Sequence, residues 1–179
     1  MNEALQQNTN LILERNLKVP DSLTPKDKEL ISWQCTLQHA TSKEQLTGFA
    51  EAYADAKKLA LDKEKLEALT ADDVTDLILR WAEMTEKRNA RGYRKTQVRF
   101  ANYSRALDPI VIERAIESLF GAFVEKNVTP VEFYTEFEKI HPFEDGNGRV
   151  GDLLWKVATT RETGKWPEEL PPDVFGVHK

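Results

Sequence analysis

Cysteine is almost missing from the sequence: Cys35 is the only one among 179 residues. An internal disulfide and a zinc site built on several cysteines are both excluded, and a reducing cytoplasm is the expected location. Long apolar runs are missing as well. No segment reaches the roughly 20 apolar residues of a membrane span, and residues 1–18 lack the apolar run of a signal peptide. We therefore expect a cytoplasmic protein without a membrane partner.

An excess of positive charge is also missing. The chain has 25 Lys and Arg against 30 Asp and Glu, which gives a formal net charge of −5. Binding to nucleic acid through bulk charge is therefore not expected. The length fits one domain, which at this size buries roughly 70% of the surface that the unfolded chain exposes.

Helix-start signals recur along the chain. In each, a side-chain oxygen can accept a hydrogen bond from an unpaired amide of the first turn, and a proline at the first helical position loses no partner. These signals are Thr24-Pro25 with Asp27, Ser42 with Gln45, Thr70 with Asp73, Asp108-Pro109, and Thr129-Pro130 with Glu132. They predict a mostly helical domain.

A basic segment between two predicted helices interrupts this pattern. Residues 91–100 alternate only weakly between polar and apolar side chains, which predicts a short hairpin or an extended flap. Two interpretations of its charges stay open: a solvated surface, or docking of an acidic target or of donor phosphates. The basic residues around the flap are Lys87, Arg88, Arg91, Arg94, Lys95, Arg99 and Arg105.

The richest chemistry lies in residues 141–149, with the sequence HPFEDGNGR. His141 follows the helix predicted from Thr129, and Pro142 disfavours helical backbone in the residue before it. The Gly-Asn-Gly turn that comes next opens an apolar helix. Its amides, the positive end of the helix dipole and Arg149 together form a site suited to phosphate.

Two acidic residues, Glu144 and Asp145, lie beside the predicted anion site, which indicates that a cation is also bound there. Glu144 and Asp145 are compatible with phosphate if magnesium bridges a carboxylate and the phosphate oxygens. A neutral His141 could accept the proton of an attacking hydroxyl. Base, metal and anion site together predict phosphoryl or nucleotidyl transfer.

Residues 141–149 resemble the signature of the Fic family, His-x-Phe-x-Asp/Glu-Gly-Asn-Gly/Lys-Arg-x-x-Arg, and the resemblance covers roughly residues 72–163. It implies an all-α domain with a small β-hairpin flap. We accordingly divide the chain into an N-terminal helical extension (1–70), a Fic core (71–165) and a coil tail (166–179).

The resemblance also implies an activity: transfer of AMP, or of another nucleotide, from a triphosphate such as ATP to a Ser, Thr or Tyr hydroxyl of a target protein, with Mg²⁺. His141 would be the base, Asp145 would hold magnesium, and Arg149 would bind the nucleotide phosphates. The anion site would come from Gly146, Asn147 and Gly148. The target would dock on the flap residues Tyr93, Arg94, Lys95, Thr96, Gln97 and Val98.

One position departs from the signature, because Asp152 stands where the family has its second arginine. Three alternatives remain open: another donor or another phosphate group, as in a phosphotransferase; ATP bound with Arg94, Lys95 or Lys156 in place of the missing arginine; or a degenerate module that binds a nucleotide or a protein. The family's inhibitory pattern has its nearest match at Glu51. Whether an antitoxin or another regulator exists is left open.

Overall fold

The computed structural model describes residues 9–100 and 104–176. None of the helices in this part of the chain has the length and apolarity that crossing a membrane requires. The regular elements are the α-helices α2 (Leu11–Glu14), α3 (Pro25–Leu37), α4 (Lys43–Leu61), α5 (Lys63–Glu67), α6 (Ala71–Thr85), α7 (Ile112–Val124), α8 (Pro130–Ile140) and α9 (Asn147–Thr163), with the 3-10 helices η1 (Lys87–Arg91) and η2 (Pro109–Val111).

The predicted helix starts are confirmed. Thr24, Ser42, Thr70 and Thr129 each form a complete capping box with the residue three positions later. Asp108 caps the short η2, which continues into α7. These contacts are local, and they fix where the helices of an all-α fold begin.

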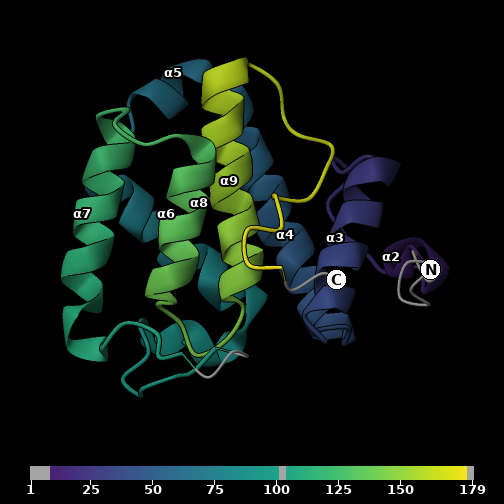
Figure 1. Cartoon of the computed structure of the whole chain (residues 1–179). Helices are drawn as coiled ribbons and strands as arrows, with labels where there is room; N and C mark the ends of the chain where they lie inside the picture. The colour runs from purple at the N-terminus through teal and green to yellow at the C-terminus, as the bar shows by residue number, and fades with distance from the viewer. Residues whose placement is uncertain (1–8, 101–103, 177–179) are drawn as a thin grey trace.

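Helix α9 lies at the centre of the bundle, with α8 and α4 beside it (Figure 1). It also contacts α6 and α5, and most of its side chains are buried. Helix α3 packs on α4 on the side away from α7 (Figure 1). The N-terminus of α9 is therefore surrounded by segments that are far from it in the sequence.

The expected β-hairpin flap is not seen as strands among the described residues. Between η1 and η2 they form a single antiparallel bridge, Arg99 with Arg105. Beside this bridge the amide of Phe100 donates to the carbonyl oxygen of Ser104 (2.9 Å), and the amide of Ala106 donates to the carbonyl oxygen of Val98 (3.0 Å). The buried guanidinium of Arg94 also binds the carbonyl oxygens of Thr96 (2.8 Å) and Leu107 (2.5 Å). The flap is therefore an extended loop held by these backbone bonds and by one side chain.

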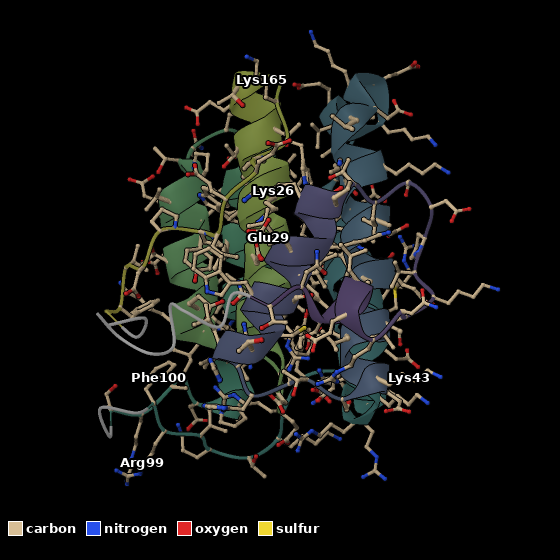
Figure 2. All side chains as sticks on the ribbon, turned by 90° about the vertical axis from the view of Figure 1, so that its right-hand side faces the viewer. Lys26, Glu29, Lys43, Arg99, Phe100 and Lys165 are labelled. Atoms are coloured by element: carbon tan, nitrogen blue, oxygen red, sulfur yellow. The ribbon has the colours of Figure 1, made fainter. Side chains whose placement is uncertain are left out.

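Figure 2 shows which end of the bundle carries this flap. Arg99 and Phe100 lie at the same end as Lys43, at the start of α4, and at the opposite end from Lys165, just beyond α9. The flap and the start of α9 therefore meet at one end of the molecule.

Candidate active site

His141 stands at the junction between α8 and the loop that follows it. Its backbone is left-handed (φ 51°, ψ 61°), a conformation that costs a non-glycine residue roughly 1 kcal/mol or more. The Phe100 ring contacts the imidazole edge-on at 5.2 Å. Burial, and then the charge of Arg94, lower the pKa of His141 to about 4. The imidazole is therefore neutral at physiological pH and can accept a proton.

The loop after His141 is held by one side chain. Asn147 donates from Nδ2 to the carbonyl oxygen of Phe143 and accepts from the Phe143 amide at Oδ1, both at 2.9 Å. Gly146, left-handed at φ 77°, precedes α9, and no described side chain caps this helix. The first-turn amides of α9 have no partner within the helix and remain open to an anion. Asn147 thus shapes the loop with its side chain and reaches the anion site only through its backbone.

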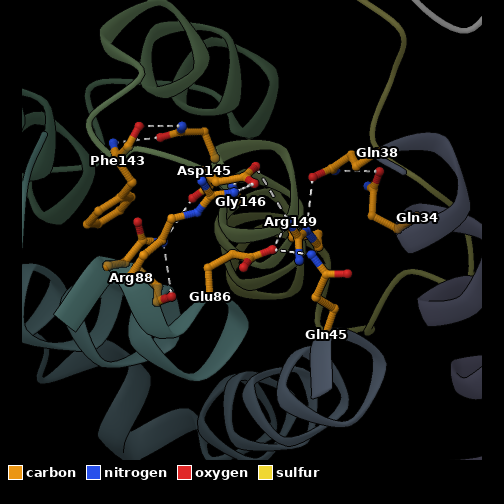
Figure 3. A network of polar contacts seen from close by, with 12 residues as sticks. Gln34, Gln38, Gln45, Glu86, Arg88, Phe143, Asp145, Gly146 and Arg149 are labelled. Carbon is orange, nitrogen blue, oxygen red and sulfur yellow. Dashed lines mark hydrogen bonds and ion pairs between the residues drawn. The ribbon is translucent and has the colours of Figure 1, made fainter. Parts of the chain in front are cut away.

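Arg149 is completely buried in this site (Figure 3). It donates from Nη2 to Oε1 of Glu86 (2.9 Å) and from Nε to Oε1 of Gln38 (3.1 Å). Its Nη1 atom has no partner among the described residues. A buried guanidinium donor without a partner indicates that a ligand oxygen completes the site.

Asp145 lies between two cations, since its Oδ1 is 3.7 Å from Nη2 of Arg149 and its Oδ2 contacts Arg88. Its Oδ2 accepts from Nη2 of Arg88 (2.5 Å), and its Oδ1 accepts from the Gly146 amide (2.7 Å). The described residues contain no cluster of three or more His, Cys, Asp or Glu side chains that could hold a metal. One partly exposed carboxylate fits a magnesium ion whose other ligands are phosphate oxygens and water.

Asp152 is held by partners inside the helix bundle. It is fully buried, forms an ion pair with Lys156 and accepts a hydrogen bond from Nε2 of Gln34 (3.1 Å). Its negative charge is neutralised locally and is not presented to a phosphate chain. Nζ of Lys156 already binds Asp152 and the carbonyl oxygen of Glu169, so, unlike Arg149, Lys156 shows no unpartnered donor for a phosphate.

The flap residues differ in exposure and divide into three groups. Arg94 is buried, and it also donates to the carbonyl oxygens of His141 (2.6 Å) and Ile140 (3.2 Å), so it anchors the flap and has no surface to offer a target or ATP. The expected docking role of Arg94 is corrected accordingly. Tyr93 and Val98 are half-buried, whereas Lys95, Thr96 and Gln97 are exposed.

Glu51 lies elsewhere, on the exposed face of α4. It lines a groove of about 780 Å³ together with Met84 and Lys58. Among the described residues, no ion pair joins Glu51 to residues 141–149. The carboxylate from outside residues 141–149 that pairs with Arg149 belongs instead to Glu86, the C-cap residue of α6. No motif in the sequence marks Glu86, so sequence reasoning missed it.

A comparison with protein families gives a match to the Fic/DOC family over residues 68–158, which is about half of the chain. Curated proteins give no match. Among solved structures, Fic-1 from C. elegans has a TM-score of 0.56 at 21% identity, and the alignment covers 93% of this chain and 44% of that one. A Fic domain containing signaling protein from Bacteroides thetaiotaomicron has a TM-score of 0.55 at 22% identity, with 90% and 67% covered. At these identities the two structures show the fold, and this chain spans less than half the length of the first.

Proposed function

Because this chain belongs to the Fic/DOC family, we propose that it transfers a nucleotide, with AMP from ATP as the first candidate, to a Ser, Thr or Tyr hydroxyl of a target protein. One observation carries the proposal. A neutral imidazole at His141 and a buried arginine with an unpartnered Nη1 at Arg149 stand at the two ends of one segment of nine residues, which runs from the end of α8 into the first turn of α9.

In the proposed reaction, His141 takes the proton of the target hydroxyl, whose oxygen then attacks the α-phosphorus of ATP. A new P–O bond forms on the target, the bond to the β-phosphate breaks, and pyrophosphate leaves. The first-turn amides of α9 and Nη1 of Arg149 bind the oxygens on which negative charge accumulates. His141 needs no deprotonation step at neutral pH because its pKa is about 4.

Asp145 would hold magnesium, which when bound neutralises charge on the donor phosphates. Oδ2 of Asp145 would be free for this role once the exposed side chain of Arg88 turns away from it, while Oδ1 stays beside Arg149. The Gly146 amide keeps its own hydrogen bond to Oδ1 of Asp145 and fixes the direction of the carboxylate.

The target is proposed to dock along the exposed part of the flap. Oγ1 of Thr96 donates to Oε1 of Glu144 at 3.3 Å, so the flap passes directly beside the loop of residues 141–149. Lys95 and Gln97 flank this contact and are exposed. An extended target segment lying there would bring a hydroxyl close to His141.

The test uses ATP labelled in either its α-phosphate or its γ-phosphate, incubated with the chain, magnesium and a mixture of acceptor proteins. We expect label in protein from the α position only, together with a mass gain of one AMP on the modified species. Label from the γ position would replace this proposal with phosphate transfer. If ATP binds but neither label enters protein, the result would replace the proposal with a nucleotide-binding module that has no transfer activity.

The matched variants follow from the backbone at position 141. Asparagine tolerates left-handed backbone better than alanine does, so His141→Asn removes the base with the smaller risk to folding. We expect both His141→Asn and His141→Ala to abolish transfer. His39→Ala is the control, since His39 is exposed and also has positive φ. Transfer that persists in both His141 variants contradicts the assigned base.

A further inference from the structure

Helix α3 lies outside the residues that match the family, yet its C-terminal end reaches the anion site (Figure 3). Gln38, which caps α3, accepts from Nε of Arg149 at 3.1 Å and donates from Nε2 to Oε1 of Gln34 at 3.0 Å. Gln34 in turn donates from Nε2 to Oδ2 of Asp152 at 3.1 Å. We call Gln34 and Gln38 the glutamine bridge, because they connect Arg149 to Asp152.

The chemistry of the two ends fixes the direction of this bridge. Arginine can only donate hydrogen bonds, and a carboxylate can only accept them. Each amide must therefore turn its oxygen toward Arg149 and its NH₂ group toward Asp152. Lys156 balances the charge at the Asp152 end. Every hydrogen bond between Arg149 and Asp152 is satisfied in this one arrangement.

Packing keeps the glutamine bridge in place. Gln34 is 4% exposed and Asp152 is fully buried, so water does not compete for their hydrogen bond. Gln38 lies directly against the first turn of α9: a Cβ atom added to Gly148 would stand 2.5 Å from Nε2 of Gln38. The amide of Gln38 thus sits on the same helical turn whose amides face the anion.

We propose that Gln34 and Gln38 are positioning residues that hold the Arg149 guanidinium in the anion site, and that Asp152 is the acceptor that sets their direction. The inference rests on the proposed function, because the anion in question is the donor phosphate. An arginine at position 152 would place a donor at each end of the glutamine bridge. Both amides would then turn their oxygens outward, and the NH₂ groups of Gln34 and Gln38 would face each other without an acceptor. Asp152 is therefore matched to α3, and the site is intact in spite of its departure from the family signature.

The first variant removes the acceptor of Arg149. In Gln38→Met, Nε of Arg149 loses its partner, and we expect the affinity for magnesium-ATP, measured by calorimetry, to weaken roughly tenfold. Thr36→Ala is the control on the same helix, because Thr36 is exposed and its hydroxyl donates to the carbonyl oxygen of Ser32 within α3. We expect this control to bind as tightly as the unmodified chain. Unchanged affinity in Gln38→Met overturns the positioning role.

A second measurement does not depend on ATP binding. The Nε–H signal of Arg149 in nitrogen-edited NMR, assigned with Arg149→Lys, should be protected from exchange in the unmodified chain and lose protection in Gln38→Met. Protection retained in Gln38→Met overturns the inference even if the chain binds no nucleotide. If protection depends on Gln38 but no ATP binds, the proposed function fails and the glutamine bridge stands.

A reversed bridge provides the rescue. In Gln38→Glu with Asp152→Asn, the carboxylate at position 38 accepts from both Arg149 and Gln34. The amide at position 152 donates to Gln34 while accepting from Lys156. We expect Gln38→Glu alone to lower the unfolding midpoint, and the pair to recover both the midpoint and the protected Nε–H signal. If the double variant has the same unfolding midpoint and the same Nε–H protection as Gln38→Glu alone, the proposed direction of the glutamine bridge is wrong.

Discussion

Glu86 and Arg149 form a buried ion pair, with 2.9 Å between Oε1 and Nη2. The same oxygen accepts from Nε2 of Gln45 at 2.7 Å, so residues of α4, α6 and α9 meet at one carboxylate (Figure 3). The guanidinium that faces the anion site is therefore already partly neutralised from within the chain. An incoming phosphate competes with Glu86 for Arg149.

We predict that Glu86→Gln strengthens anion binding. The amide keeps an oxygen for Arg149 and for Gln45 but removes the negative charge, so Arg149 is left with a larger net attraction for phosphate. We expect the affinity for magnesium-ATP to rise by roughly tenfold, or about 1.4 kcal/mol. Isothermal calorimetry measures it. Glu83→Gln, an exposed change on the same helix, should leave the affinity unaltered, and equal affinity in both variants would show that Glu86 does not compete.

The parts of the fold that were predicted from the sequence are the local ones. A capping box such as Thr70 with Asp73 is complete within four residues, and it appears in the structure as expected. The end of α8 at His141 and the turn at Gly146 follow from neighbours in the sequence as well, since proline and glycine act within one or two residues; the left-handed backbone of His141 was not predicted.

The parts that escaped prediction depend on long-range contacts. Glu86 is 63 residues from Arg149, and Gln34 is 118 residues from Asp152. No sequence pattern around Glu86 or Gln34 predicts its distant partner. Arg94 was misread for the same reason: a basic residue in a polar segment normally faces solvent, and only the fold brings four carbonyl oxygens around its guanidinium.

Glu138 gives a prediction about pH. Its Oε1 is shielded from solvent and has no partner among the described residues. Burial, and then the charge of Asp152, raise its pKa from 4.5 to about 8. Between pH 4.5 and 8 the folded state therefore keeps a proton on Glu138 that the unfolded state has lost. The contribution of Glu138 to the free energy of unfolding is complete below about pH 4.5 and is lost as the pH rises toward 8.

We expect Glu138→Gln to reduce the decrease of the free energy of unfolding with pH between pH 6.5 and 8. The variant should be more stable than the unmodified chain at pH 8. His141 adds a slope of opposite sign near pH 6.5, where its unfolded imidazole is half protonated, but this slope is common to all the variants compared and does not affect their difference. Urea unfolding at several pH values measures the effect. Glu136→Gln, an exposed change on the same helix, should retain the original slope; a slope retained by both variants counts against a buried acid at Glu138.

Arg94 gives a prediction about stability. Arg94→Met leaves four carbonyl oxygens without their donor, and we expect a loss of about 2–4 kcal/mol together with faster proteolysis of residues 91–100. Urea unfolding and limited proteolysis measure the two effects. The neighbouring Lys95→Met is exposed and should cost less than about 0.5 kcal/mol. If Arg94→Met keeps full stability and loses only target modification, Arg94 docks the target after all.

Gly48 and Gly121 make a matched pair of glycines in helix interiors. A Cβ atom on Gly48 would clash with the carbonyl oxygen of Met84, and this neighbour is backbone that cannot rotate away. Gly48→Ala should therefore push α4 away from the C-terminal end of α6. Glu86, which pairs with Arg149, lies at that end. We expect a loss of about 1–3 kcal/mol from the overpacked contact.

Gly121 lies in α7 and has open space where a Cβ atom would be. Gly121→Ala should therefore stabilise the protein by about 0.5–1 kcal/mol, because alanine has the higher helix propensity and restricts the unfolded chain. Thermal unfolding of the two variants compares the signs directly. Opposite signs mean that the close contact between α4 and α6 outweighs helix propensity at Gly48. Stabilisation by both changes would mean that the two helices separate freely and do not fix the position of Glu86.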